Sequence, residues 1–313
     1  MTEFEVISRY FKEAESSLST EVPIGEDCAV FIPSPGMNVA VSVDATIEGQ
    51  HVPKNCHGDG FAHRCLRRSL SDIAAQGAEA KYILLSLTLP SFDKQWLDDF
   101  TSAFFNDLKL FKITLLGGDI SKGHMAAHVT SFGEVPPGQS LLRNGAQIGD
   151  KLVVLGGDLG GARAFLDVYR GSLKKTEFSD VWEKRYWLPE PALNLGVFCR
   201  GKVSALIDIS DGLAQDLGHI ISHSSLSAFI YSSLLPITTG LIETFGLSRA
   251  IKYALTGGDD YVLLAAIPEK NLCFFSGIPH VVIGYFGARK ETKIWLDDAP
   301  ISVELSQGWD HSK

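Results

Sequence analysis

The chain has 313 residues, of which 45% are hydrophobic and 21% charged, with a formal net charge of -9. This composition is typical of a globular protein and excludes a disordered one, and the length favours two domains. No basic cluster exceeds "RCLRRS" at 64–69, which argues against a nucleic-acid surface. An anionic substrate would therefore have to be bound through metal ions or a few placed basic residues.

The five cysteines are scattered and never form a C-x-x-C pair, so neither a disulfide framework nor a zinc site is predicted. The first residues lack the pattern of a signal peptide. The longest strongly apolar stretch, at 82–90, is far shorter than the roughly 20 residues that span a bilayer. We expect a cytoplasmic protein with no nucleic-acid or membrane partner.

The first part of the chain alternates strand-like and helix-like patterns. A short amphipathic helix opens it, and the patterns then predict strands at 28–32 and 38–44, a helix at about 60–77, a strand at 80–90, a helix at about 93–109, and strands at 112–119 and 126–135. Trp96, Phe100 and Phe104 recur every four residues, which predicts the core-facing stripe of the second long helix.

The turn-rich stretch "VPPGQSLLRNGAQIGD" at 135–150 separates two patterned regions and predicts domains at 1–137 and 138–313. The second region predicts strands at 151–157, 205–210, 227–236, 261–268, 280–288 and 293–297, with helices at about 160–170, 180–199, 212–224 and 241–255. Helices and strands alternate in both parts, so the expected fold class is α/β (α+β).

Six aspartates stand where apolar runs break off. They are Asp27, Asp44, Asp72, Asp119, Asp208 and Asp211. Two unpaired carboxylates about 4 Å apart repel by roughly 1 kcal/mol in water and about 4 kcal/mol at a surface dielectric. If the six converge they need cations, and an all-oxygen ligand set is typical of Mg²⁺ or Mn²⁺.

Two of the motifs carry a specific chemical interpretation. Asp119 follows "ITLLGG", where two glycines allow the backbone to turn sharply at the end of a strand and to approach a phosphate and its metal. A β-turn without any ligand explains the same residues equally well. In "DISDG", either Ser210 or Asp211 could cap the following helix, but capping explains one acidic residue and not two. Asp208 lies inside an apolar strand, where an unpaired charge is costly, so a metal or phosphate role is favoured.

Other signals are weaker or negative. His51, seven residues after Asp44, is either a site residue or a satisfied structural histidine. No P-loop and no protein-kinase motif set is present. In "GGDLGGA" at 156–162, Asp158 takes the place of the second glycine of a dinucleotide fingerprint, so no dinucleotide site is expected there.

Read together, eight motifs resemble one family. They are "IGEDCAV", "VSVDATIEGQH", "SLSDIAAQGA", "LLGGD", "LLRNGAQIGD", "DISDGLAQDLGHI", "TGGDDYVLL" and "GWDH", in family order from residue 24 to 311. The chain is similar to thiamine-monophosphate kinases, within the superfamily of aminoimidazole ribonucleotide synthetase-like ATP enzymes. The resemblance implies a two-domain fold, with an N-terminal mixed sheet that forms a barrel in a homodimer. It also implies a C-terminal α/β domain that completes the active-site cleft.

The resemblance further implies ATP-dependent phosphorylation of thiamine monophosphate to thiamine diphosphate, with several Mg²⁺ ions and in-line transfer. It assigns metal ligation to Asp27, Ser42, Asp44, Asp72, Asp119, Asp208 and Asp211, ATP contacts to Gly118, Asp119, Arg143 and Ser210, and thiamine phosphate contacts to His51, Asp259 and Trp309. Among these, Asp44, Asp119 and Asp211 are the implied catalytic residues. Without the family, Trp309 could equally be a hydrophobic plug.

Several positions depart from the family pattern, namely Val43, Arg64, Ser69, Ile120, Asp259 and Val262. All the metal aspartates are present, so the departures bear on acceptor specificity and turnover. Two other functions stay open on this basis: an ATP enzyme of the superfamily that acts on another acceptor, and a non-catalytic Mg-nucleotide binding protein. A selenophosphate synthetase is disfavoured, because no early Gly-Cys segment precedes the first metal strand.

Overall fold

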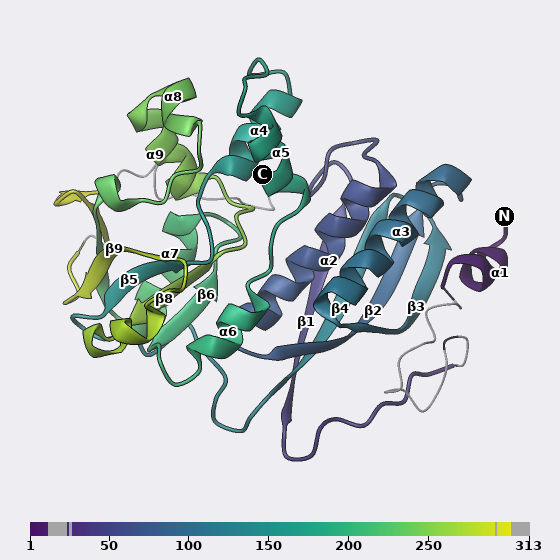
Figure 1. The fold of residues 1–313 in the computed structure, drawn as a ribbon, viewed down its shortest axis with the longest axis horizontal. Coiled ribbons are helices and arrows are strands. Elements are labelled where there is room, and N and C mark those ends of the chain that lie inside the picture. Colours follow the sequence, from purple (N-terminus) through teal and green to yellow (C-terminus); the bar gives the residue numbers. More distant parts are fainter. Residues whose placement is uncertain (12–23, 25–26, 292, 302–313) are drawn as a thin grey trace. The chain divides into compact units, whose positions relative to one another are not determined.

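The computed structural model describes residues 1–11, 24, 27–291 and 293–301. The chain divides into two compact units: residues 1–73 with 78–138, and residues 74–77 with residue 139 onward. Figure 1 shows the elements of each unit. Among the described residues, no helix is both long enough and apolar enough to cross a membrane.

The first unit is built on a four-stranded mixed sheet in the order β1-β4-β2-β3. Its strands are β1 (Asn38–Ile47), β2 (Glu79–Leu89), β3 (Thr114–Lys122) and β4 (Ala126–Val135). Only β2 and β3 run parallel, because the helix α3 (Lys94–Phe111) connects them as a crossover. The other neighbours pair antiparallel.

Helices α2 (Gly58–Ala75) and α3 cover one face of this sheet (Figure 1). Along β2, the buried Leu85, Leu87 and Leu89 alternate with half-buried residues, which gives the strand one core-facing side. The predicted aromatic stripe of α3 is confirmed, since Phe100 and Phe104 are fully buried and their rings stack with centroids 5.4 Å apart.

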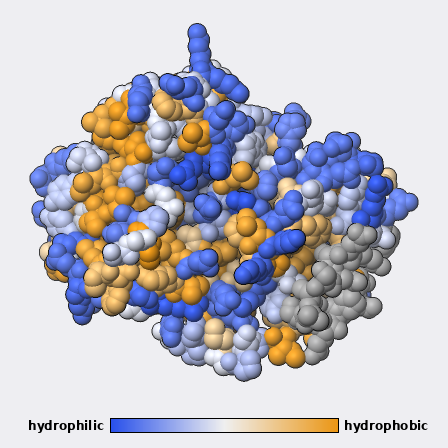
Figure 2. All heavy atoms as spheres, in the orientation of Figure 1, coloured by the Kyte–Doolittle hydropathy of each residue, from blue (hydrophilic) through white to orange (hydrophobic). Residues whose placement is uncertain are grey.

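The opposite face of the sheet carries apolar side chains that helices do not cover in the described part of the chain. On β1, Val39, Val41 and Val43 are 41%, 57% and 66% exposed. The helices α2 and α3 face the viewer in Figure 1, so Figure 2, in the same orientation, shows the helix-covered side with its mixture of polar and apolar residues.

Residues 28–32 do not form the predicted strand. They contain only an isolated bridge at Phe31, whose ring packs against Tyr82 at 4.7 Å and Phe132 at 5.8 Å between centroids. Pro33 and Pro35 follow at once and cannot donate to a ladder, so a regular strand does not extend through this segment. The N-terminal helix is present as α1 (Glu3–Val6) and the π-helical turn η1 (Ile7–Phe11).

The second unit contains a seven-stranded sheet in the order β11-β10-β7-β9-β5-β8-β6. Its strands are β5 (Lys151–Leu155), β6 (Ala205–Asp208), β7 (Ser227–Ile230), β8 (Leu263–Ile267), β9 (His280–Gly287), β10 (Ile294–Leu296) and β11 (Ala299–Pro300). Only β10 and β7 are parallel. Strands β9 and β10 are consecutive in sequence, but β7 lies between them.

The helices of the second unit are α4 (Gly161–Tyr169), α5 (Ser179–Trp187), α6 (Leu193–Cys199), α7 (Leu213–Ser224), α8 (Leu241–Phe245) and α9 (Leu247–Thr256), with 3₁₀ turns η3 (Ser232–Leu234) and η4 (Glu269–Phe275). Helices α4, α5 and α8 share a separate apolar cluster with α9, whereas α6 and α7 cover the sheet. Along β5, Leu152 and Val154 join the core with α7, while Val153 and Leu155 join the core with α6. The strands are therefore apolar on both sides.

The predicted helices at 180–199 and 241–255 are each two helices in the structure. Pro189 and Pro191 separate α5 from α6, because proline lacks the N–H that a continuous helix needs. Gly246, with a φ of 76°, separates α8 from α9. The mixed α and β fold class is confirmed.

Candidate active site

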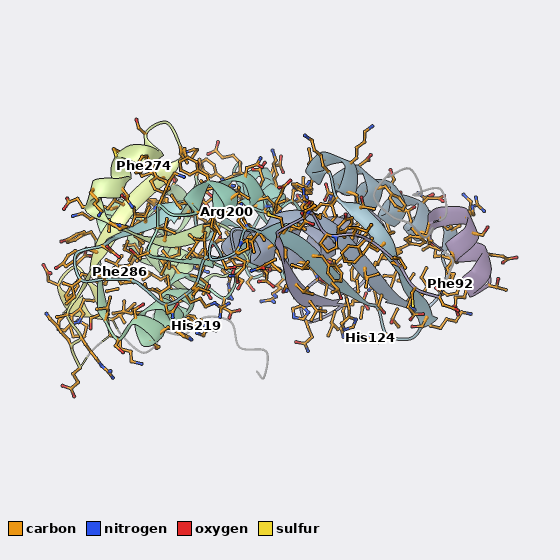
Figure 3. The ribbon with its side chains drawn as sticks, turned by 90° about the horizontal axis from the view of Figure 1, so that it is seen from below. Phe92, His124, Arg200, His219, Phe274 and Phe286 are labelled. Atoms are coloured by element: carbon orange, nitrogen blue, oxygen red, sulfur yellow. The ribbon has the colours of Figure 1, made fainter. Side chains whose placement is uncertain are left out.

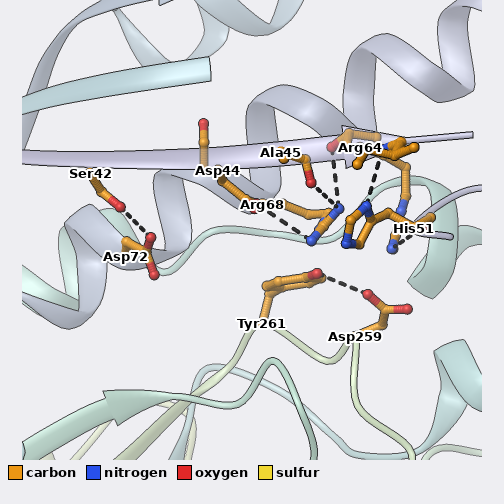
Figure 4. Close-up of polar contacts among 12 residues, drawn as sticks. Ser42, Asp44, Ala45, His51, Arg64, Arg68, Asp72, Asp259 and Tyr261 are labelled. Carbon is orange, nitrogen blue, oxygen red and sulfur yellow. Dashed lines mark hydrogen bonds and ion pairs between the residues drawn. The ribbon is translucent and has the colours of Figure 1, made fainter. Parts of the chain in front are cut away.

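In the first unit, β1 directs alternate polar side chains toward α2 (Figure 4). The Ser42 hydroxyl donates a hydrogen bond of 2.5 Å to Oδ2 of Asp72 on α2. Two residues further along the strand, Oδ2 of Asp44 lies 3.6 Å from Nη2 of Arg68 on the same helix. Strand periodicity thus places Ser42 and Asp44 on one face, and α2 supplies their partners.

Arg68 is a buried cation next to a predicted metal ligand. Its side chain is 8% exposed, and its guanidinium also donates to the hydroxyl of Thr46 at 3.2 Å. The sequence showed it only as part of a short basic cluster. In the structure, the positive charge of Arg68 lies next to the negative charge of Asp44. Arg68 therefore offsets the charge of this carboxylate and holds it in place.

His51 lies in a tight turn at the end of β1. Its backbone N–H donates to the carbonyl oxygen of Ile47 at 2.9 Å, and its ring Nδ1 accepts the N–H of Ile47 at 3.0 Å. Arg64 donates from Nη2 to the carbonyl oxygen of His51 at 3.3 Å. Hydrogen bonds therefore hold both the backbone of this turn and the imidazole ring of His51.

The prediction of a sharp turn at "GGD" is wrong, because β3 continues through Asp119 to Lys122. A β-bulge instead shifts the register between Ile83 and Leu84, just before the glycines on the facing strand. Gly118 is needed for close approach to that strand, since a Cβ there would lie 1.7 Å from the carbonyl oxygen of Leu85. Asp44 and Asp72 likewise lie within an element rather than at its end.

Asp27 and Asp119 both line one cavity of about 710 Å³ in the first unit. Gly118 also lines it, and Phe31 and Phe132 contribute apolar walls. Both aspartates are exposed, and they come from segments far apart in sequence. Two of the six aspartates therefore share a concave, partly apolar pocket, which is the usual form of a small-molecule site.

In the second unit, Asp208 ends β6 and is 4% exposed, and Asp211 lies in the turn before α7. The turn is organised by Asp216, which nothing in the sequence pattern marks as a site residue. Burial, followed by the charges of Asp208 and Asp211, raises the pKa of Asp216 to about 8, while hydrogen bonds from the backbone of Asp211 and Gly212 act in the opposite direction. Three carboxylates thus influence one another here.

The loop that contains Asp259 is joined to this turn by backbone hydrogen bonds. The N–H of Tyr261 donates to the carbonyl oxygen of Ile209 at 2.8 Å, and the hydroxyl of Tyr261 donates to Oδ1 of Asp259 at 2.8 Å (Figure 4). Asp259 and Tyr261 have φ values of 59° and 52°, which non-glycine residues adopt rarely and at a cost. The surrounding contacts therefore impose this loop conformation.

Two further titratable residues of the second unit, Asp260 and His219, were not predicted as site residues from the sequence. Asp260 accepts the N–H of Gly160 at 2.9 Å, and burial raises its pKa well above the ordinary value. On α7, burial followed by the charge of Arg143 lowers the pKa of His219, while Asp211 raises it. Arg143 and Asp211 therefore both lie within electrostatic range of His219.

The donor set fits a hard cation, since the predicted ligands are carboxylate and hydroxyl oxygens. Among the residues that the structure describes, no three His, Cys, Asp or Glu side chains gather closely enough to hold a metal by themselves. Trp309 falls outside the described residues. The metal assignments at the six aspartates and Ser42 stay predictions.

The model of the N-terminal domain of AIR synthase related proteins matches residues 25–135, so the first unit has the AIR synthase-like fold. The thiamine-monophosphate kinase of Escherichia coli (strain K12) is 34% identical over 99% of this chain and 98% of its own length, and that of Haemophilus influenzae is 32% identical over 100% and 98%. The chain belongs to the thiamine-monophosphate kinase family and is a kinase.

Solved structures agree with this placement. A thiamine-monophosphate kinase from Stenotrophomonas maltophilia K279a has a TM-score of 0.86 and 31% identity, covering 96% of this chain and 98% of its own. The structure "AaThiL complexed with AMPPCP and TMP" has a TM-score of 0.80 and 26% identity, covering 98% and 96%. The family resemblance predicted from the eight motifs is confirmed.

Proposed function

We propose that this chain transfers the γ-phosphoryl group of ATP to the phosphate of thiamine monophosphate, giving thiamine diphosphate and ADP. The observation that carries the proposal is full-length similarity to relatives named for this activity, one of which was solved with AMPPCP and TMP. The physical support is the direct joining, in the second unit, of the turn assigned to ATP and metal with the loop assigned to the acceptor.

The proposal assigns the ligand contacts as follows. ATP is contacted by Gly118, Asp119, Arg143 and Ser210, and thiamine monophosphate by His51, Asp259 and Trp309. Arg143 suits a phosphate because its planar guanidinium presents a fork of donors. Asp259 suits the cationic thiamine because it is a carboxylate whose Oδ1 is held by the hydroxyl of Tyr261.

We further propose that Mg²⁺ ions are held by Asp27, Ser42, Asp44, Asp72, Asp119, Asp208 and Asp211. When bound, these ions would neutralise part of the negative charge of the phosphates. The protein's own contribution is rigidity: Asp72 holds the hydroxyl of Ser42, and Arg68 holds Asp44. The side chains on β1 are thereby oriented before any ligand arrives.

Transfer is proposed to be direct and in line, with no phosphorylated protein intermediate. The acceptor phosphate is itself largely ionised near neutral pH, so no protein base or nucleophile is required to activate it. The task left to the protein is to place donor and acceptor in line and to stabilise the transferred charge.

The test is a coupled assay in which purified protein, Mg²⁺, ATP and thiamine monophosphate are incubated and products are separated by chromatography. Equal amounts of ADP and thiamine diphosphate are expected. Bound AMPPCP without product would favour the non-catalytic binding protein. Product from a different phosphorylated acceptor, but none from thiamine monophosphate, would favour another enzyme of the superfamily.

We also propose a homodimer formed through the open face of the first unit's sheet. Val39, Val41 and Val43 form an exposed apolar row on β1, a ten-residue strand at the edge of the described sheet, and a second copy of the same row is a chemically matched cover. Light scattering after gel filtration should give twice the chain mass, and the double variant Val41→Lys with Val43→Lys should give the monomer.

The matched control for the dimer is Leu110→Lys. Leu110 is 62% exposed on α3, which packs on the other face of the sheet. It should leave the dimer intact. A wild-type protein that runs as a monomer at all concentrations tested would exclude this interface.

A further inference from the structure

Asp216 makes an unusual set of contacts for a residue inside a helix. Its Oδ2 atom accepts three consecutive backbone N–H groups, from Ser210 at 3.0 Å, Asp211 at 3.0 Å and Gly212 at 3.1 Å. The residue is only 3% exposed. Burying a carboxyl group is costly unless it is hydrogen-bonded, and here three successive N–H groups form a concave backbone arrangement around one of its oxygen atoms.

These contacts differ from a usual helix cap, in which the side chain of the N-cap residue accepts the N–H of the second or third helical residue. The N-cap of α7 is Gly212, which has no side chain with which to accept a hydrogen bond. Asp216, within the first turn of the helix, reaches back and satisfies the N–H groups that precede it. The path of the chain from Ser210 to Gly212 is thus determined by a side chain that itself lies outside this turn.

The Ser210–Gly212 turn also supports the neighbouring loop, which contains Asp259. Gly258, with a φ of 65°, packs so closely that an added Cβ would lie 2.8 Å from the carbonyl oxygen of Ser210. Asp259 and Tyr261 donate their backbone N–H groups to Ser210 and Ile209. A shift of the turn would therefore move Asp259 as well as Asp211.

A second residue of α7 acts on the side chain of Asp211. Gln215 donates from Nε2 to Oδ2 of Asp211 at 3.0 Å. One turn further along, the same helix carries His219, labelled in Figure 3. Adjacent residues of α7 thus hold different parts of Asp211: Asp216 holds its backbone N–H, and Gln215 holds its carboxylate.

We propose that Asp216 is a positioning residue, whose carboxylate fixes the Ser210–Gly212 turn and through it both Asp211 and Asp259. This inference rests on the proposed function for the roles of Asp211 and Asp259, but not for the contacts of Asp216. Outer contacts that orient ligand residues typically change metal affinity or activity by about 10–100-fold when removed.

The experiment compares Asp216→Ala, Asp216→Asn and the control Asp167→Asn. Asp167 is a carboxylate of similar burial on α4 that accepts from Tyr253 and pairs with Arg163 and Arg249. Five quantities are measured: amide hydrogen exchange of peptides covering 208–214, binding of AMPPCP as a function of Mg²⁺ concentration, kcat, KM and the thermal midpoint.

For Asp216→Ala, we expect faster exchange of the amides of Ser210, Asp211 and Gly212, with β6 still protected. The Mg²⁺ concentration that half-saturates AMPPCP binding should rise and kcat should fall, each by about 10–100-fold. Asp216→Asn keeps an oxygen that can accept the N–H groups, so it should recover part of each effect. Asp167→Asn should lower the thermal midpoint without any of these changes.

The proposal is overturned if exchange at 210–212 stays slow in Asp216→Ala, or if both Asp216 variants lower the thermal midpoint as Asp167→Asn does while Mg²⁺ dependence and kcat stay at wild-type values. If Asp216→Ala does not fold, Asp216→Asn decides between these outcomes. A wild-type protein without kinase activity would refute the proposed function, whereas exchange and AMPPCP binding would still test Asp216.

Discussion

The backbone N–H of Asp259 donates a hydrogen bond of 2.8 Å to the carbonyl oxygen of Ser210. This bond joins two segments about fifty residues apart in sequence, one assigned to ATP and the other to the acceptor. Because a backbone bond between two loops tolerates little displacement, the spacing of the two assigned ligand sites in the second unit is set by the fold.

Replacing Tyr261 with Phe should weaken acceptor binding. The change removes the hydroxyl that donates to Oδ1 of Asp259 at 2.8 Å, and hydrogen bonds to charged groups contribute about 1.5–3 kcal/mol. We expect the KM for thiamine monophosphate to rise by about tenfold or more, while the KM for ATP changes little. Steady-state kinetics with each substrate varied in turn checks this, and an equal rise in both KM values would contradict the assignment.

Replacing Asp119 with Asn should abolish activity without unfolding the protein. The side chain is exposed on β3, so the free energy of unfolding should change by no more than about 0.5 kcal/mol. Loss of the charge that we propose to hold the phosphate and its metal should reduce kcat by at least about 100-fold. Circular dichroism and the coupled assay on the same sample measure both, and retained turnover would show that the metal assignment is wrong.

The close approach at Gly118 predicts a specific loss of stability. Gly117 and Gly118 have similar φ values of 155° and 159°, but only a Cβ at Gly118 meets the carbonyl oxygen of Leu85. Gly118→Ala should therefore reduce the free energy of unfolding by about 1–3 kcal/mol more than Gly117→Ala. Urea denaturation of the two variants gives this difference, and equal losses would mean that the strands adjust without cost.

A buried charge network between α2 and α3 predicts a pH-dependent contribution to stability. Asp107, which is 2% exposed, accepts hydrogen bonds of 2.7 Å from Arg67, and its Oδ2 lies 2.7 Å from Nδ1 of His63. Burial raises the pKa of Asp107, but the contacts with Arg67 and His63 outweigh it and lower the pKa below the ordinary value. The folded state therefore favours the charged carboxylate.

Asp107→Ala should cost about 3–5 kcal/mol near neutral pH, because Arg67 is left buried without its carboxylate. The contribution is present above the unfolded-state pKa of about 3.9 and is lost as the pH falls through the lower folded-state pKa. Urea denaturation of wild type and variant at several pH values should show the difference narrowing in acid. Asp99→Asn on the same helix, at a carboxylate that accepts from the exposed Gln95, is the control and should change little.

The elements with strong periodicity were predictable from the sequence. The helices α2 and α3, the long strands of the first unit and α7 appear within a few residues of their predicted ranges, because each buries one continuous apolar side. The predicted strand at 28–32 does not form, because prolines follow its apolar run directly. The predicted turn at Gly118 does not form either, because β3 continues through that residue. A glycine pair predicts close approach, but not whether a ligand or a neighbouring strand is what approaches.

Candidate site residues could be named from the sequence where the chemistry shows in single residues, and not where it arises from tertiary contacts. Asp208 and Asp211 stood out because acids are rare beside apolar strands. Asp216 did not, since an acid in the first turn of a helix is ordinary and only the folded turn shows three N–H groups directed at it. Arg68 was missed for the same reason. The cytoplasmic location stays a prediction from the sequence.

The hydrogen bond from the Ile47 amide to Nδ1 of His51 also determines which proton the ring carries. Because Nδ1 accepts, the neutral imidazole must have its hydrogen on Nε2, and that nitrogen acts as a donor. An uncharged donor favours an anionic oxygen, such as one on a phosphate, over a cation. The backbone of β1 therefore fixes the orientation of the imidazole through its Nδ1 atom.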